Sequence, residues 1–250
     1  MKSKEDWNAY GEEDPFYGVL SEEKYKYKNL DESGYAEFYK TGFEYVEELN
    51  GRLMAKFSKD IHDMDILDFG CGVGRLALPF AKKSSGQVTG LDVAPGMIKI
   101  ADEQKAVHRI ENLTYHAYSG MEIPDLGTFD LVNSYIVIQH IEPAIGYSLI
   151  DQLCQKAKIG GIVHLQMPYG HNIPKLQYLK FYLKVHSNLY NRFTNLIKTG
   201  KFRRSPVMQM NYYSPEKLKA IFNKYTDTVH SERTDHGGHL GHYYFFKREK

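Results

Sequence analysis

Apolar residues in the first two thirds of the chain fall into short runs, separated by segments with helical periodicity. Five apolar runs are typical of buried strands and lie at 64–69, 87–92, 112–116, 128–138 and 162–167. Between them, apolar residues recur every three or four positions, as in amphipathic helices, over 74–83, 95–107 and 145–158. Strands that alternate with helices at this spacing predict an α/β fold with a parallel, doubly wound sheet.

The flanking segments follow other patterns. Residues 1–30 are rich in aromatic side chains without a regular period, so we expect them to be irregular, whereas 34–58 has the apolar spacing of a long helix. After the fifth strand, 170–212 breaks the alternation with helical stretches rich in Lys, Arg and Tyr. A helix at 214–225 is followed by two strands around a glycine-rich turn, at 226–232 and 242–247.

The predicted architecture is therefore a seven-stranded, mostly parallel sheet with helices on both faces and a C-terminal antiparallel hairpin. A helical segment precedes the sheet, and a helical insertion follows the fifth strand. In terms of domains, we expect 1–60 to form an aromatic cap segment and 61–250 to form the main domain. Within it, 170–212 is expected to be a basic insertion that covers the substrate.

The composition is that of an ordinary globular protein. Of the 250 residues, 42% are hydrophobic and 25% are charged. There is no apolar run of about 18 residues, so no membrane span is expected, and the polar start lacks the apolar core of a signal peptide. Two cysteines, Cys71 and Cys154, are too few for a disulfide framework. These features predict a cytoplasmic protein.

Charge is distributed unevenly, although the net charge is only +1. Residues 1–65 carry sixteen acidic and nine basic side chains, whereas 152–215 carry ten Lys or Arg and no Asp or Glu. A single-sign stretch of this length produces a positive field over part of the surface. Two interpretations stay open: a basic face that answers the acidic N-terminal segment, or a binding site for an anionic substrate.

The segment 65–75 has the pattern of a nucleotide-binding turn. A short strand meets glycines at Gly70, Gly72 and Gly74, and a helix follows. Glycine permits positive φ and close approach of a ligand, and the start of the helix offers free N–H groups. A dinucleotide fingerprint would need glycine where Arg75 stands, and a phosphate loop would need Gly-Lys-Ser/Thr, so neither pattern is met.

Further features follow this turn at regular places. Asp92 ends the second strand 18 residues after Gly74, where a carboxylate can accept both hydroxyls of a ribose. With 90–98, 118–124 and 129–141, the turn resembles the ordered motifs of class I S-adenosylmethionine (SAM) methyltransferases, in the small-molecule branch of types 11, 12 and 25. The resemblance covers 64–168, and more loosely the C-terminal helix and hairpin. It implies SAM as the methyl donor and S-adenosylhomocysteine (SAH) as the product.

The resemblance also implies which residues bind the cofactor. The hydrophobic residue after the acid, Val93, would pack on adenine, and Ser119 stands where many relatives place an Asp that accepts from the adenine amine. The glycine turn suits the cationic sulfonium and the amino-acid tail of SAM. The residues implied are Asp68, Phe69, Gly70, Cys71, Gly72, Gly74, Arg75, Asp92, Val93, Met97, Ser119, Gly120, Met121, Ser134, Tyr135 and Ile136.

A hydroxyl acceptor must lose its proton as it attacks, and a histidine can take that proton near neutral pH. His140, at the cofactor edge of the 129–141 segment, is the candidate catalytic residue; His236, His239 and His242 near the terminal hairpin are further candidates. That trio has only Asp235 beside it and lacks the H-E-x-x-H spacing, so no metal is expected.

The acceptor is expected to contact the two segments outside the alternating pattern, 5–30 and 170–212. Aromatic rings with Lys and Arg can bind a sugar or a phosphorylated group. Tyr17, Tyr169 and His239 are the substrate candidates. The predicted function is methylation of a hydroxyl on a small molecule that is anionic or contains a sugar.

Three alternatives stay open. An RNA methyltransferase would use the basic stretch 156–204 as a phosphate track. A lipid-modifying enzyme at a membrane surface would insert the helix of 175–198 into anionic lipid. A SAM-binding module without catalysis is the third alternative. DNA is not expected as a partner, and the sequence does not predict an oligomeric state.

Overall fold

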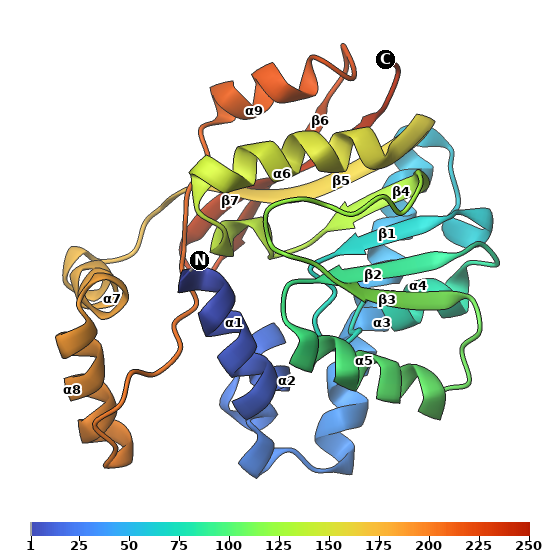
Figure 1. The fold of residues 1–250 in the computed structure, drawn as a ribbon. Coiled ribbons are helices and arrows are strands. Elements are labelled where there is room, and N and C mark those ends of the chain that lie inside the picture. The colour runs from blue at the N-terminus through green and yellow to red at the C-terminus, as the bar shows by residue number, and fades with distance from the viewer. Residues whose placement is uncertain (1) are drawn as a thin grey trace.

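The computed structural model describes residues 2–250, where seven strands form one sheet (Figure 1). The strands are β1 (Ile66–Phe69), β2 (Val88–Asp92), β3 (Leu113–Ala117), β4 (Phe129–Ser134), β5 (Ala157–His171), β6 (His230–His236) and β7 (His239–Lys247), in the order β3-β2-β1-β4-β5-β7-β6. β1 to β5 run parallel, and β7 runs antiparallel to both β5 and β6. The predicted mostly parallel α/β sheet with its terminal hairpin is confirmed.

Each face of the sheet has its own apolar core. The helices concerned are α3 (Glu32–Phe57), α4 (Ala77–Lys83), α5 (Pro95–Val107), α6 (Pro143–Lys156) and α9 (Pro215–Phe222). Because side chains alternate along a strand, Ile66 and Leu131 pack with α3, α4 and α5, whereas Leu67 and Val132 pack with α6 and α9. Strands buried on both faces explain the nearly continuous apolar runs in the sequence.

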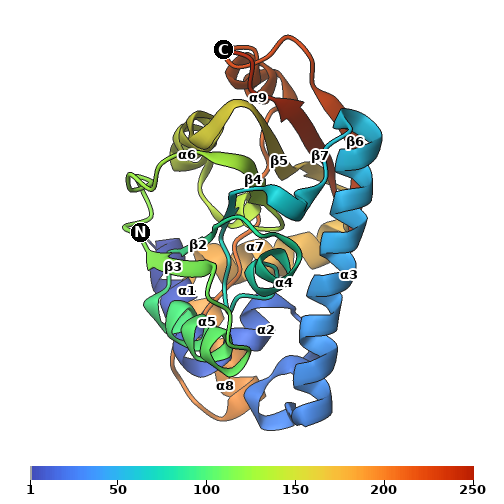
Figure 2. The same cartoon turned by 90° about the vertical axis from the view of Figure 1, so that its right-hand side faces the viewer.

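The long helix α3 runs along one side of the molecule (Figure 2). The Asp31 carboxylate caps its start by accepting from the backbone N–H of Gly34 at 2.8 Å. Its end is marked by Ser58 in the left-handed region, with φ of 52°. The predicted helix at 34–58 is confirmed to within two residues.

The bounds of four predicted strands moved. β4 ends at Ser134 instead of 138, because the chain turns at Ile136 with a positive φ of 58°. β5, predicted at 162–167, begins at Ala157 and continues to His171, because its outer half pairs with β7. The strand expected at 226–232 begins at His230, and its partner begins at His239.

The expectation that residues 1–30 are irregular was wrong. They contain α1 (Lys2–Glu13), α2 (Pro15–Val19) and two short 3₁₀ turns, η1 (Glu23–Tyr25) and η2 (Tyr27–Asn29). Two glycines let α1 lie directly against α5: a Cβ on Gly11 would come within 3.1 Å of the backbone nitrogen of Met97, and the backbone of Gly96 lies opposite. A helix held by close backbone contact needs little apolar periodicity of its own, so the spacing of apolar residues in 1–30 did not predict α1.

The helical insertion consists of α7 (Lys175–His186) and α8 (Asn188–Thr199), which stand beside α1 and away from the sheet (Figure 1). The chain then returns along α1. Arg204 makes a bidentate ion pair with Asp6, with one N–O distance of 2.8 Å, and Arg203 pairs with Glu13. Part of the basic stretch therefore forms ion pairs with the acidic N-terminal segment, which supports the interpretation as a basic face that complements this segment.

Within 2–250, no helix is long and apolar enough to cross a bilayer. The short 3₁₀ turns η3 (Ile61–Asp63) and η4 (Ile138–His140) complete the elements. Residues of α1, α2 and α3, including Tyr10, Phe16 and Leu53, belong to the same apolar core as β1. The division of the chain at residue 60 stays a prediction.

Candidate functional site

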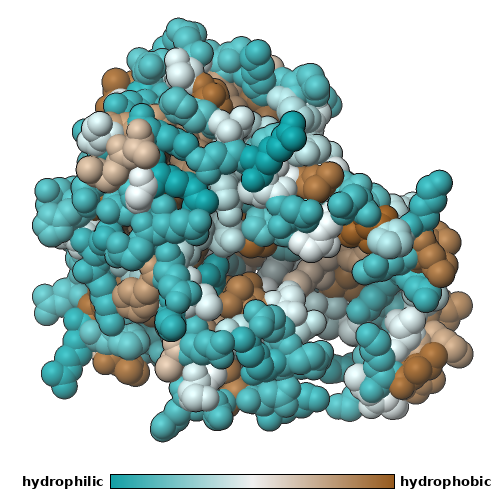
Figure 3. Space-filling model, turned by 180° about the vertical axis from the view of Figure 1, so that it is seen from behind, coloured by the Kyte–Doolittle hydropathy of each residue, from teal (hydrophilic) through white to brown (hydrophobic). Residues whose placement is uncertain are grey.

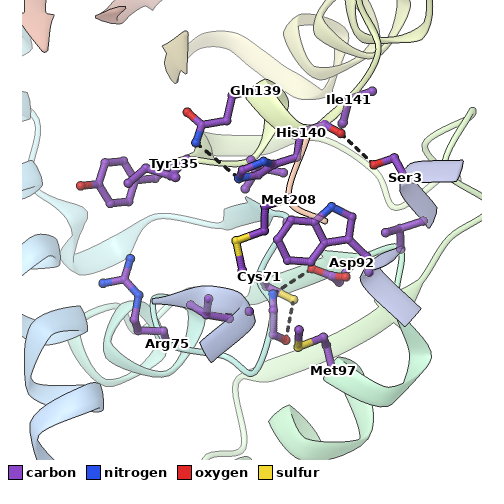
Figure 4. A pocket seen from close by; sticks show the side chains of 18 of the residues that line it. Ser3, Cys71, Arg75, Asp92, Met97, Tyr135, Gln139, His140, Ile141 and Met208 are labelled. Carbon is purple, nitrogen blue, oxygen red and sulfur yellow. Dashed lines mark hydrogen bonds between the residues drawn. The ribbon is translucent and has the colours of Figure 1, made fainter. Parts of the chain in front are cut away.

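A cavity of about 460 Å³ lies at the carboxyl ends of β1, β2 and β4. In an open parallel sheet, this is the edge where ligands bind. Figure 4 shows Asp92, Cys71 and Met97 on one side of the cavity and Gln139 and His140 on the opposite side. The walls thus come from the strand ends, from α1 and α2, from 208–210 and from the β6–β7 turn.

The glycine turn after β1 forms the floor. Gly70 and Gly72 have φ of 76° and 55°, which favour glycine. A Cβ on Gly70 would overlap the side chain of Val137, and one on Gly72 would come within 2.7 Å of Val19. The cavity therefore depends on the absence of side chains at both positions.

Asp92 is fixed at the end of β2. Its two carboxylate oxygens accept from the backbone N–H groups of Gly72 and Ala94, both at 2.9 Å. These bonds orient the carboxylate toward the cavity that it lines, and its remaining lone pairs stay available to a ligand. Burial raises the pKa of this carboxyl despite the two bonds.

Asp68 has one occupied and one free oxygen. Oδ1 accepts from the side-chain amide of Asn133 at 2.8 Å, whereas Oδ2 is buried without a hydrogen-bond partner among the described residues. The side chain lines the cavity with 2% exposure, and burial raises its pKa to about 6. A free carboxylate oxygen in this setting is suited to a cationic group of a ligand.

Arg75 provides a buried cation nearby. Its Nη1 donates to Thr41 Oγ1 at 3.3 Å, and its guanidinium lies 5.8 Å from the centre of the Tyr135 ring. Nε has no partner among the described residues, and burial lowers the pKa of the group. Asp68 and Arg75 thus offer opposite charges to one cavity, as a zwitterionic amino-acid group would require.

Most of the predicted residues meet at this cavity. Those that line it are Asp68, Gly70, Cys71, Gly72, Arg75, Asp92, Val93, Met97, Gly120, Tyr135, Ile136, His140 and His239. Others of the predicted set lie outside its lining, namely Phe69, Gly74, Ser119, Met121, Ser134, Tyr17 and Tyr169. The structure therefore brings the glycine turn and Asp92 together at the cavity, whereas several residues adjacent to the predicted motifs do not line it.

The residues outside the lining have other contacts. Phe69 points into the core beside Tyr118, and a Cβ on Gly74 would meet the hydroxyl of Tyr115. On the substrate side, Tyr17 packs near Tyr10, with ring centres 6.4 Å apart. Tyr169 lies against the ring of His242 at 5.0 Å, away from the cavity lining.

His140 lines the cavity with both ring nitrogens engaged. Nδ1 lies 2.6 Å from the carbonyl oxygen of Gln209, and Nε2 lies 3.3 Å from the side-chain nitrogen of Gln139. A bond to a carbonyl requires Nδ1 to carry the hydrogen, so Nε2 accepts from Gln139. Burial lowers the pKa of the ring to about 4, which makes it a weak base.

The wall from the β6–β7 turn carries two further histidines, His236 and His239. His239 Nδ1 lies 2.9 Å from the hydroxyl of Tyr212. His236 Nε2 is buried without a partner among the described residues, and its ring lies 6.0 Å from that of Tyr135. Desolvation lowers the pKa of His236, so its ring is neutral near pH 7.

Several lining residues were not predicted. Ser3, Lys4 and Trp7 come from α1, and Met208 and Met210 come from the segment after α8. Ser3 Oγ donates to the carbonyl oxygen of His140 at 2.7 Å, so α1 closes over the cavity. The segments 5–30 and 170–212 were expected to contact the acceptor, and they include Trp7 and 208–210, but these lining residues were not singled out.

Part of the chain is similar to known proteins. Residues 66–161 match the methyltransferase domain family. Aklanonic acid methyltransferase DauC of Streptomyces sp. (strain C5) is 37% identical over 93 residues, which are 35% of this chain and 42% of that protein. The 23S rRNA (uracil(1939)-C(5))-methyltransferase RlmD of Alcanivorax borkumensis is 28% identical over 122 residues, 45% of this chain and 27% of the relative. The chain thus spans less than half the length of these curated relatives.

Similarity of fold extends further. The magnesium protoporphyrin IX methyltransferase ChlM of Synechocystis PCC 6803, solved with SAH, matches 98% of this chain and 97% of its own. The TM-score is 0.64 and the sequence identity is 16%. At this identity the likeness concerns the fold, which is that of class I methyltransferases.

Proposed function

We propose that the protein transfers a methyl group from SAM to a hydroxyl of a small acceptor, releasing SAH, because residues 66–161 match the methyltransferase domain family. The cavity lies at the carboxyl ends of β1, β2 and β4, the edge where ligands bind to an open parallel sheet, which supports a cofactor site there. Cys71 and Cys154 are both free and buried, which supports a reducing compartment such as the cytoplasm.

The cofactor assignment rests on Asp68 and Arg75. SAM ends in an amino acid with an ammonium and a carboxylate. Asp68 Oδ2 could accept from the ammonium and Arg75 Nε could donate to the carboxylate, because neither atom has a hydrogen-bond partner among the described residues. Asp92 would accept the ribose hydroxyls, while the exposed backbone of Gly70 and Gly72 lets the ligand approach closely.

When bound, SAM supplies a methyl group on a cationic sulfur that is a good leaving group. The protein then has to align the acceptor with that methyl and to exclude water. α1 performs the second task, because Ser3 and Trp7 close the cavity against His140. Apolar Met208 and Met210 line the same side and keep it dry.

The acceptor side is best formed by Tyr135, His236 and His239, which line the cavity together. His236 is the better proton acceptor, because its Nε2 has no partner within 2–250, whereas Nε2 of His140 already accepts from Gln139. In the tautomer with hydrogen on Nδ1, His236 would take the hydroxyl proton as the acceptor oxygen attacks the methyl. His140 would hold the 208–210 segment in place through its bond to the carbonyl oxygen of Gln209.

The acceptor class rests on the polar character of this wall. Histidine and tyrosine side chains can hydrogen-bond the several oxygens of a sugar or an acid. Aklanonic acid methyltransferase, by its name, acts on a small acid. Arg203 and Arg204 form ion pairs with α1, so these two of the ten basic side chains in 152–215 are not available to a phosphate backbone.

Calorimetric titration with SAH tests the cofactor assignment. We expect binding by the unaltered protein and at least about a tenfold loss in Asp92→Ala and Gly72→Val, since the first removes the ribose partner and the second fills the cavity. Asp125→Ala, at an exposed loop position, should bind normally. No binding by the unaltered protein, or full binding by both site variants, would reject the proposal. Transfer from radiolabelled SAM into fractionated extracts would then identify the acceptor.

A further inference from the structure

Helix α8 has its polar face turned inward and its apolar face turned outward. Asn191 and Asn195 are buried, and their side-chain amides bond to carbonyl oxygens of Lys201, Arg203 and Ser205. On the opposite face, one stripe of large apolar side chains is exposed, namely Leu189 at 69%, Phe193 at 57%, Leu196 at 37% and Ile197 at 74%. A surface helix normally shows the reverse arrangement.

Helix α7 extends the same kind of surface. None of its residues is buried, and Leu176, Leu179 and Leu183 are exposed large apolar side chains. The return segment adds Phe202, which is also exposed. Figure 3 shows brown, hydrophobic residues gathered along the edge of the molecule where α7 and α8 lie. We call this set of exposed side chains on α7, α8 and Phe202 the outer face.

The charged residues on α7, α8 and the turn after them are all basic. Lys175, Lys180, Arg192 and Lys201 are exposed, and 152–215 contains no Asp or Glu. Exposed leucine, phenylalanine and isoleucine among lysines make a surface that is at once apolar and positively charged. Amphipathic helices that lie in the interface of an anionic bilayer have these two properties together.

We propose that the outer face docks on the surface of an anionic lipid bilayer, with the apolar stripe of α8 in the headgroup region and the lysines against lipid phosphates. Two other occupants fit less well. A nucleic acid would use the lysines but would leave Leu189, Phe193 and Ile197 without a partner. A second copy in a two-fold contact would set this positive surface against itself.

Docking would place the cavity near the membrane. The segment after α8 passes along α1, and 208–210 then line the cavity. An acceptor that partitions into lipid would therefore meet the protein beside its cavity. The docking itself does not depend on the proposed methyl transfer.

Flotation of the full chain with lipid vesicles tests the proposal. We expect binding to vesicles of phosphatidylcholine with phosphatidylglycerol, and weak binding to phosphatidylcholine alone. Phe193→Glu with Ile197→Glu should reduce the partition coefficient by about tenfold or more, because each exchange removes an inserted side chain and adds a repelled charge. Arg192→Gln, which flanks the stripe on α8, should reduce it about fivefold, on the anionic vesicles only.

Ile159→Glu is the matched control, because Ile159 is 67% exposed but lies at the start of β5, away from the outer face. It should bind vesicles like the unaltered chain. Circular dichroism and SAH titration of the variants check that each folds and keeps its cavity.

Four results would overturn the docking proposal. One is an absence of binding to anionic vesicles at low salt. Another is equal loss of binding in Ile159→Glu. A third is salt-sensitive RNA binding that the glutamate exchanges at Phe193 and Ile197 leave unchanged, together with no vesicle binding. The last is a dimer in sedimentation velocity that those exchanges dissociate, because the outer face would then be an interface between copies.

Discussion

The carboxyl group of Asp68 lies where burial opposes its charge. Its pKa is raised to about 6, above the ordinary value of 3.8. The folded protein therefore binds this proton more tightly than the unfolded chain does. The stabilisation from the protonated form is fully present below about pH 3.8 and is lost as the pH rises through about 6.

Asp68→Asn should therefore stabilise the free protein at about pH 8, by on the order of 1–3 kcal/mol, and by less at about pH 5. The same exchange should weaken SAH binding at least about tenfold, because a neutral amide cannot pair with the ammonium. Thermal melts at both pH values and calorimetry measure the two effects. If stability and affinity fell together, Asp68 would be a structural residue and its assignment would be wrong.

Histidines on opposite walls of the cavity allow the proton acceptor to be identified. His236→Gln should lower the rate of methyl transfer from radiolabelled SAM about a hundredfold, with SAH affinity unchanged, because only the proton acceptor is lost. His140→Gln should affect affinity for the acceptor more than the rate, since its ring holds the Gln209 carbonyl. The reverse pattern would restore His140 as the catalytic residue.

Site residues could be predicted where local chain geometry decides their position. Gly70, Gly72 and Asp92 follow strand ends, and parallel strands bring those ends to one edge. Phe69 is the immediate neighbour of Gly70 but points into the core, because alternation along β1 decides its direction. Trp7 could not be predicted, since its place in the cavity depends on contacts with residues far away in the sequence.

At the scale of elements, the same substitution at two glycines of α3 can distinguish the effect of helix propensity from that of packing. Gly42 lies against α4, where an added Cβ would overlap the carbonyl oxygen of Arg75, while nothing lies within 4 Å of one at Gly51. Gly42→Ala should therefore destabilise the protein by about 3 kcal/mol or more. Gly51→Ala should stabilise it by about 0.5–1 kcal/mol, because alanine is the better helix former.

Urea unfolding of both variants measures this contrast. The two exchanges are chemically identical and lie in one helix, so a shared sign would mean that propensity alone decides and that α3 does not need its close contact with the glycine turn. Since Arg75 lines the cavity, Gly42→Ala should also weaken SAH binding, whereas Gly51→Ala should not.

The elements of the alternating core could be predicted because each carries its own period. β1 to β3 and α3 to α6 were predicted to within three residues of their true bounds, whereas β4 was predicted too long and β5 too short. α1 was missed, because its contact with α5 uses Gly11 and Gly96 and not an apolar stripe. The outward apolar face of α8 was also hidden, since periodicity tells which residues share a face but not which way that face is turned.

At the scale of the whole molecule, the N-terminal helix α1 and the segment after α8 meet at the cavity. Asp6 is 1% exposed and pairs with Arg204, so α1 is tied to the segment that leads to Met208. Asp6→Asn should weaken this tie, raise amide hydrogen exchange in 2–13, and weaken SAH binding about threefold or more, because fewer molecules have α1 in place.

Glu13→Gln is the matched control for this change. Glu13 pairs with Arg203 in the same way, but both side chains are largely exposed, so the loss should be small. Equal effects of the two exchanges would show that overall charge, and not the buried pair, holds α1. An unchanged exchange rate in Asp6→Asn would show that α1 stays in place without the pair.

The union of α1 with the return segment also sets an order of events during synthesis. Ser3 and His140 are 137 residues apart, and Asp6 and Arg204 are 198 apart. On the ribosome, α1 emerges first but has to wait for the residues beyond 204 before it can close. The sheet strands β1 to β4 can pair long before that point. In a nascent chain, the glycine turn that forms the floor of the cavity can therefore fold early, whereas α1 closes over it among the last steps. A closed cofactor cavity is thus expected only after the residues beyond 204 have been synthesised.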